Sequence, residues 1–186
     1  METQLYLLHV VPFIIFVYLG FLLFLHPPRE VLLASLLGGL TMGVINALVD
    51  LLAHYASWWH YAAIGLILQL PLPFYITPIL IFGGLSYLLI WRFWHTRWHW
   101  LALLLLFGVP IVGFLRDLID ATVTQDSFLV WNNPILAGPL DLVLWLVMFY
   151  AGYFVFRRLA PERKSEPQPI AMTSNSRSSL ATRRPR

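Results

Sequence analysis

Cysteine is absent from the chain, and charged residues are scarce. Without cysteine there is no disulfide framework and no thiolate metal site. Charged residues make up 11% of the 186 residues, whereas a soluble domain has about a quarter. The sequence also lacks H-E-x-x-H, G-x-S-x-G and glycine-rich phosphate-loop motifs. We therefore predict no metal and no cofactor.

Long apolar runs take the place of the missing charge. Hydrophobic residues make up 59% of the chain, and a membrane-spanning helix needs about 20 of them in succession. Suitable stretches cover residues 5–25, 31–53, 73–91 and 100–115, the last continuing past Arg116; a fifth runs from Pro134 or Pro139 to Phe156. Residues 61–70 are apolar but too short to span, so an interfacial or re-entrant piece is expected there.

The composition changes near residue 159. From Ala160 onward the chain is rich in Pro, Ser, Thr, Arg and Glu, which cannot build a packed core. We therefore expect an all-α integral membrane protein, with a helical bundle over residues 1–158 and a disordered basic tail over 159–186. Cations beside a membrane attract anionic lipids, so membrane lipids are expected partners. No aromatic or folded element accompanies these charges, and nucleic-acid binding is not expected.

The basic residues gather on one side of the predicted membrane. Eleven of the twelve lysines and arginines fall in segments on the same side as the C-terminus, and Arg116 is the exception. Positive residues mark the cytosolic side. This distribution predicts a multi-pass protein of the cell membrane, with its N-terminus outside and its C-terminus in the cytosol.

Two pairs of spans resemble each other weakly. Asp50 and Asp117 each begin a similar triplet, at an offset of 117 − 50 = 67, and Pro71 and Pro139 correspond at 139 − 71 = 68. A duplication would give one span followed by two repeated hairpins, a repeat type known in transporters. Two unrelated helical hairpins of equal length would have similar residues at their ends and turns. A duplication and a chance similarity therefore both stay open.

Small side chains recur along the second span. Ser35, Gly39, Gly43 and Ala47 follow one another at intervals of four residues, which places them on one helical face. Such a face lets another helix approach closely. We predict helix packing at this face, either within the bundle or with a second copy or a partner membrane protein.

A polar stripe runs beside that face. Asn46, Asp50 and His54 are also spaced by four residues. An ionisable side chain within a span costs roughly 3 kcal/mol and normally faces protein or water. The stripe is therefore either a structural pair of Asp50 with His54 at the helix end, or a site that binds a ligand or a proton.

Further polar residues fall near the same, outer ends of the fourth and fifth spans. Arg116, Asp117 and Asp120 end the fourth, and the two aspartates share a helical face if the helix continues. Asp141 is about two turns, or roughly 10 Å, deep if the fifth span begins at Pro134. If that span begins at Pro139, Asp141 is a first-turn carboxylate favoured by the helix dipole.

These residues allow three functions. Because no catalytic motif is present, we favour a non-enzymatic membrane subunit or assembly protein. One alternative is a small enzyme or binding protein for a lipid or isoprenoid, with Asp50, His54 and Asp141 as catalytic groups and Asn46, Arg116, Asp117 and Asp120 as ligand contacts. The other is an oligomeric transporter of small solutes. The chain lacks the Pro-x-Glu-Glu signature of membrane carotenoid cyclases and the acid-rich Mg²⁺ motifs of UbiA-type prenyltransferases, so no family is assigned.

Overall fold

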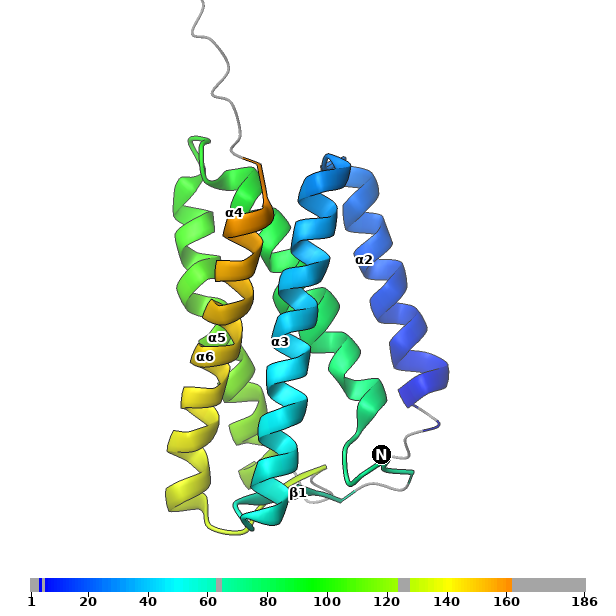
Figure 1. The fold of residues 1–186 in the computed structure, drawn as a ribbon, viewed down its shortest axis with the longest axis vertical. Coiled ribbons are helices and arrows are strands. Elements are labelled where there is room, and N and C mark those ends of the chain that lie inside the picture. The colour runs from blue at the N-terminus through cyan, green and yellow to red at the C-terminus, as the bar shows by residue number, and fades with distance from the viewer. Residues whose placement is uncertain (1–3, 5, 63–64, 124–127, 162–186) are drawn as a thin grey trace, which may run out of the picture.

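Five helical rods lie side by side in the computed structural model, which describes residues 4, 6–62, 65–123 and 128–161 (Figure 1). The first joins a π-helical turn, η1 (Tyr6–Val10), to α2 (Val11–Leu25), and the second is α3 (Arg29–Tyr55). The third joins a 3-10 turn, η2 (Leu72–Tyr75), a π-helix, η3 (Pro78–Leu85), and α4 (Ser86–Phe93). The last two are α5 (His99–Val123) and α6 (Pro134–Leu159).

All five rods are long and apolar enough to cross a membrane, which confirms the five apolar helices predicted from the sequence. The fourth extends well past Arg116, to Val123. The fifth begins at Pro134, where the Asn133 side chain caps the helix by accepting a hydrogen bond from the Ile135 amide at 3.2 Å. This start places Asp141 about two turns inside the helix, as the first of the two alternatives predicted.

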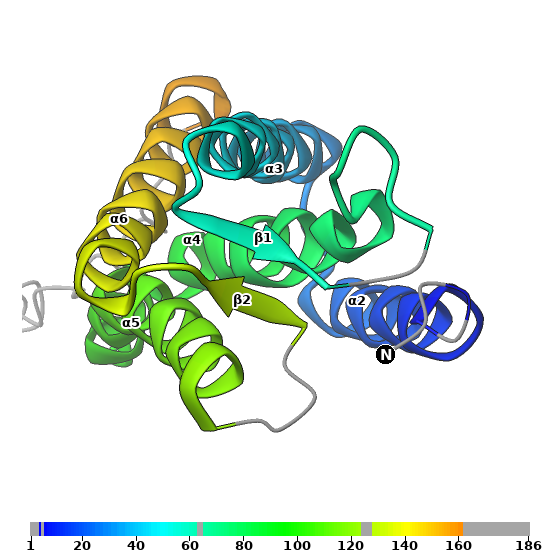
Figure 2. The same ribbon diagram turned by 90° about the horizontal axis from the view of Figure 1, so that it is seen from below.

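The rods do not contribute equally to the core. Seen along the bundle, α4 lies among α2, α3 and α5, with α6 beside α3 and α5 (Figure 2). The most extensive contacts join α3 to α6 and α3 to η3. The first rod contacts mainly the third rod, at η3 and η2. Only 11% of the apolar stretch of the first rod is buried, against 50% for the third rod. It is therefore a peripheral element attached to a four-rod core.

Glycines allow the closest helix contacts. A Cβ atom on Gly39 would collide with the carbonyl oxygen of Ile79 in η3, and one on Gly43 would collide with the Ile79 side chain. On the adjacent face, a Cβ on Gly38 would lie 2.7 Å from the carbonyl oxygen of Gly152 in α6. The small-residue face predicted in the second span thus lies against η3 of the same chain. On this face Ser35 is buried and Ala47 is half-buried.

A short antiparallel sheet closes one end of the bundle, which the all-helical prediction did not include. β1 (Trp59–Tyr61) follows α3, β2 (Leu129–Trp131) follows α5, and Trp59 pairs with Trp131 (Figure 2). Aromatic and β-branched residues favour strands, but three residues are too few to show an alternating pattern. The described part of 61–70 beyond β1 contains no helix; it turns through positive φ at Gly65, Leu68 and Gln69.

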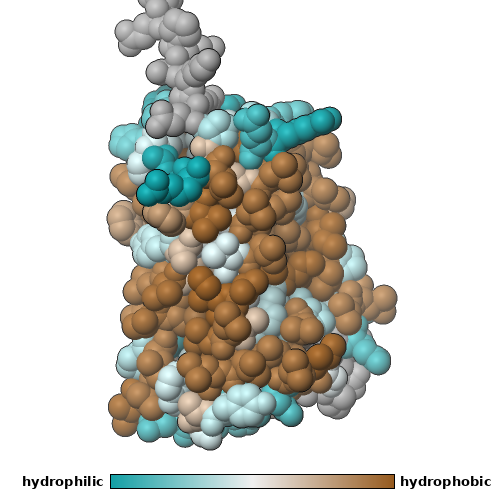
Figure 3. Space-filling view, viewed as in Figure 1, coloured by the Kyte–Doolittle hydropathy of each residue, from teal (hydrophilic) through white to brown (hydrophobic). Residues whose placement is uncertain are grey.

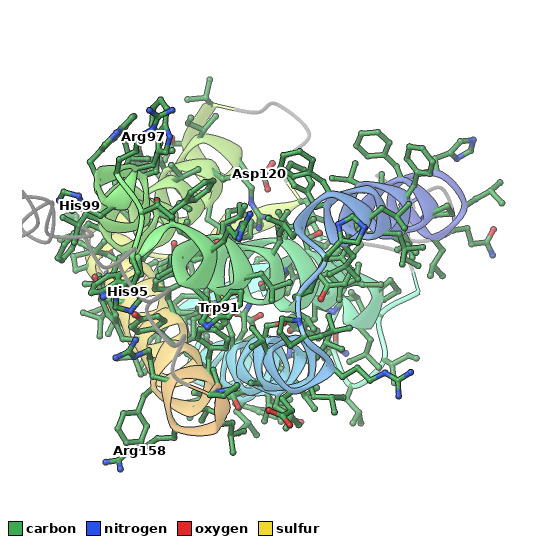
Figure 4. All side chains as sticks on the ribbon, turned by 90° about the horizontal axis from the view of Figure 1, so that it is seen from above. Trp91, His95, Arg97, His99, Asp120 and Arg158 are labelled. Carbon is green, nitrogen blue, oxygen red and sulfur yellow. The ribbon has the colours of Figure 1, made fainter. Side chains whose placement is uncertain are left out.

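The two ends of the bundle differ in charge. β1 and the start of the first rod lie at one end, and the C-terminal end of α6 lies at the other (Figure 1). Between them the visible face is mostly apolar, with scattered less apolar patches (Figure 3). His95, Arg97, His99 and Arg158 lie together on one side of the bundle in the view from the end opposite the sheet (Figure 4). The predicted tail falls almost entirely outside the described residues.

Candidate functional site

Asp50 lies in the last two turns of α3, where it is buried and 2% exposed. Its Oδ1 accepts a hydrogen bond from the Trp59 indole at 3.0 Å. Its Oδ2 accepts two more, from the hydroxyls of Tyr61 and Tyr75, each at 2.8 Å. Both carboxylate oxygens are therefore engaged, which is what a buried carboxylate requires.

The three donors come from the segment that follows α3. Trp59 and Tyr61 belong to β1, and Tyr75 belongs to η2. Asp50 thus holds the connection between the second and third rods against the end of α3. Burial and the neighbouring Asp50 raise the pKa of the Tyr61 hydroxyl above its ordinary value, which keeps this group a hydrogen-bond donor.

His54 does not form the predicted pair with Asp50. Within the described part of the chain, the hydrogen bonds of Asp50 go to Trp59, Tyr61 and Tyr75. The half-buried His54 ring instead packs edge-on against Tyr55, with ring centroids 5.6 Å apart. The pairing fails because the chain returns after α3 and supplies better donors than a side chain one turn along the same helix.

Arg116 and Asp117 form an ion pair on α5. The guanidinium donates to Asp117 Oδ1 through Nε at 2.9 Å and through a terminal nitrogen at 2.7 Å. Asp117 Oδ2 accepts from the indole of Trp145 in α6 at 2.7 Å. The Arg116 side chain is 54% exposed, whereas that of Asp117 is 14% exposed. Asp117 is therefore fixed from both sides, and its cation partner remains accessible.

Asp141 is buried without a hydrogen-bond partner among the described residues. It is 4% exposed, and its Oδ2 is enclosed and unpaired. Trp145, one turn further along α6, gives its N–H to Asp117. No described hydrogen bond links Asp50 to Asp141.

A cavity of about 250 Å³ opens beside these residues at the sheet end. Its lining comes from α3, from α5, from the segments around β1, η2 and β2, and from the start of the first rod. The lining residues are Tyr6, Asn46, Tyr61, Pro71, Phe74, Tyr75, Pro78, Arg116, Asp117, Asp120, Phe128 and Leu129. The four residues predicted as ligand contacts are all in this lining. The three predicted as catalytic, Asp50, His54 and Asp141, are not.

Aromatic rings form one wall of the cavity. Tyr6 stacks on Phe74 at 3.8 Å between ring centroids, and Phe74 stacks on Phe128 at 4.2 Å. Tyr61 packs against Phe128 at 5.1 Å, and the Tyr6 hydroxyl is hydrogen-bonded to Thr77 at 2.6 Å. Sequence reasoning missed this wall, because its members come from four separate segments of a chain in which 16% of residues are aromatic.

Two other polar side chains face the cavity. Asp120 Oδ2 accepts a hydrogen bond from the Leu129 amide at 2.9 Å, which ties α5 to β2. Asn46, one turn before Asp50, has no hydrogen-bond partner among the described residues and is only half-buried. The site therefore offers one neutralised ion pair, one carboxylate bound to the backbone, and one amide available for hydrogen bonding.

The two aspartates predicted as acid or base do not line the cavity, whereas Asp117 and Asp120 do. A general acid or base must reach the group on which it acts, and neither Asp50 nor Asp141 lines the cavity. Comparison with known protein families, curated sequences and solved structures finds no match to this chain, so its function must be inferred from its own residues.

Proposed function

We propose that this chain is a multi-pass membrane protein that binds the polar end of an amphiphilic molecule in the cavity at its outer end, without catalysing a reaction. The observation that carries the proposal is the convergence of Asn46, Arg116, Asp117 and Asp120 on one cavity with an aromatic wall. Ligand sites commonly combine an apolar or aromatic lining with a few placed polar groups.

The membrane location is supported by the rods and by what they expose. Large apolar side chains such as Phe16, Phe24 and Phe107 are 75%, 79% and 61% exposed, which would be unfavourable in water. In lipid the same side chains need no cover. The orientation rests on the basic residues: Arg29, Arg92, Arg97 and Arg158 lie at rod ends opposite Asp50, and cations favour the cytosolic side. We place the protein in the cell membrane with its N-terminus outside and membrane lipids around it.

Accessibility of introduced cysteines tests this orientation without background, because the chain has no native cysteine. Ser57→Cys lies at the sheet end, and Thr96→Cys lies between α4 and α5. In intact cells a membrane-impermeant maleimide should label Ser57→Cys and spare Thr96→Cys and Ser165→Cys. Labelling of Thr96→Cys with sparing of Ser57→Cys would reverse the assignment.

The cavity is tested by photolabelling. A long-chain alcohol that carries a diazirine near its hydroxyl is irradiated with the protein in lipid nanodiscs, and the adducts are located by mass spectrometry. Adducts are expected on the segments that contain Phe74 and Phe128. Asn46→Trp should fill the cavity and abolish them, whereas Leu48→Trp, at a 62% exposed position on the same helix, should not. Adducts spread evenly along the rods in all three proteins would reject the binding site.

A membrane subunit is the second candidate. The observation in its favour is the first rod, whose apolar surface is mostly uncovered. The Gly39/Gly43 face was the predicted contact for a second copy or a partner, but it already lies against Ile79. Gly39→Leu should therefore destabilise the single chain, as overpacking does by about 1–3 kcal/mol. Leu40→Ile, at a 48% exposed position, is the matched control.

The two hairpins are proposed to be a duplication. Each consists of a helix with an aspartate near its outer end, a short strand, and a helix that returns, and the two strands pair antiparallel. Antiparallel pairing is what a two-fold axis along the rods would produce, because that axis reverses a strand lying across it. The axis would then pass near the pair of His60 with Val130.

A further inference from the structure

The charges around the cavity are already balanced in part. Arg116 gives two N–H groups to Asp117, so the accessible cation has its counter-charge in place. An anionic ligand would have to compete with Asp117 for the guanidinium, and it would also lie near Asp120. A cationic ligand would lie near Arg116, and the remaining carboxylate of the lining, Asp120, already accepts a hydrogen bond from the Leu129 amide. Like charges at close range repel each other.

Among the described residues, Asn46 is a neutral polar member of the lining whose side chain makes no hydrogen bond, whereas the tyrosine hydroxyls are bonded. Asn46 faces the cavity, and its amide has no hydrogen-bond partner among the described residues. An amide can both donate and accept. A hydroxyl or a carbonyl complements it without adding charge. The ring wall of Tyr6, Phe74 and Phe128 offers apolar contact to the carbon atoms next to that group.

We infer that the cavity selects an amphiphile with an uncharged polar end, a hydroxyl or carbonyl, which bonds to Asn46 beside the neutralised Arg116–Asp117 pair. This inference rests on the proposed function, since it names the ligand class of the same site. The volume, about 250 Å³, lies just below the range of roughly 300–1,000 Å³ that holds a whole drug-sized ligand. The cavity therefore takes the polar end and the first carbons, and the remaining chain lies along the apolar rods.

Competition among three probes of equal chain length tests the inference. Hexadecanol, palmitate and hexadecylamine are each titrated against the photoreactive alcohol, with wild-type protein in nanodiscs of uncharged lipid. Hexadecanol should displace the label at a concentration about tenfold lower than the other two, the ratio expected from one unfavourable polar contact. Equal or stronger competition by palmitate or by hexadecylamine overturns the inference. Absence of labelling at the cavity rejects the proposed function itself, so the two failures are distinguishable.

Charge variants provide the matched controls. Arg116→Gln leaves Asp117 uncompensated and should make hexadecylamine the strongest competitor. Asp117→Asn leaves Arg116 uncompensated and should favour palmitate. Asn46→Leu removes the amide but keeps the number and branching of side-chain heavy atoms, and it should weaken hexadecanol about tenfold, while Asn46→Gln, which keeps an amide, should weaken it less. Unchanged probe order in both charge variants would show that the ion pair does not control selection, and the inference would fail.

Discussion

Asp50 and Asp141 are buried at the same end of the bundle, and their surroundings are opposite. Asp50 accepts three hydrogen bonds, and all of its donors come from the segment that leaves its own helix. Asp141 has no hydrogen-bond partner among the described residues. Sequence position alone made the two look equivalent, as carboxylates near the outer ends of apolar spans. The difference shows that a buried carboxyl stabilises the fold where several donors bond to it. A buried carboxyl without such donors is not expected to stabilise the fold.

The largest expected effect is that of Asp50→Leu. It leaves three buried donors without an acceptor, and each unsatisfied group carries a desolvation penalty. We expect a loss of roughly 3–5 kcal/mol in the free energy of unfolding. Unfolding of the detergent-solubilised protein by SDS titration measures it, with Leu52→Ala, at a 55% exposed position in the same turn, as the control. A loss under about 1 kcal/mol would mean that the three bonds add little.

Single donors to Asp50 should have intermediate effects. Tyr75→Phe removes one hydrogen bond to a carboxylate, which costs about 1–3 kcal/mol. Trp59→Phe removes another and also leaves space around a buried ring, so it should cost more. The coupling is measured by combining Tyr75→Phe with Asp50→Leu in the same titration. If the hydroxyl acts through Asp50, Tyr75→Phe should have little further effect in that background. A full, additive loss in the double variant would place the contribution of Tyr75 elsewhere.

Asp117→Asn should cost less, about 0.5–1 kcal/mol. Arg116 is 54% exposed, and ion pairs with an exposed partner contribute little. The Asn side chain can keep an oxygen toward the Trp145 indole, so that hydrogen bond should survive. Trp145→Phe in the Asp117→Asn background separates the two contributions in the same assay. A loss as large as that of Asp50→Leu would show that the pair is effectively buried.

The smallest effect, and one of opposite sign, is expected for Asp141→Leu. This substitution removes a buried carboxyl that makes no described hydrogen bond, and it should be neutral or stabilise the fold by about 1 kcal/mol. The identical change at Asp50 serves as its reference. Destabilisation similar to that of Asp50→Leu would reveal a partner that holds the Asp141 carboxyl.

The rods could be predicted from the sequence because lipid-sized apolar runs are a strong signal. The start of α6 at Pro134 could also be predicted, because Asn followed by Pro is typical of a helix N-terminus. β1 and β2 could not be predicted, because three residues show no period and each strand is stabilised by the other. The π-helical geometry of η3 has no clear sequence signature either.

The polar residues of the cavity lining could be predicted from their residue type and their position along the membrane spans. Asn46, Arg116, Asp117 and Asp120 fall near the outer ends of spans, and all four line the cavity. The same criterion also selected Asp50, His54 and Asp141, which do not line it. The partners of Asp50 were not foreseen: Trp59 and Tyr61 fit an interfacial aromatic belt equally well. Choosing between a belt and a buried bond requires the path of the chain after Tyr55, which depends on tertiary contacts rather than on local pattern.

The spacing of these contacts along the chain also implies an order of assembly during synthesis. Asp50 finds its donors within 9, 11 and 25 positions, so this anchor can form once residue 75 has left the ribosome. The contact of His60 with Asn132 spans 72 positions, and so it must wait for the second hairpin. Short-range contacts form before long-range ones because they close smaller loops. The first hairpin should therefore be a preformed template, and β1 should remain an unpaired edge until β2 emerges to complete it.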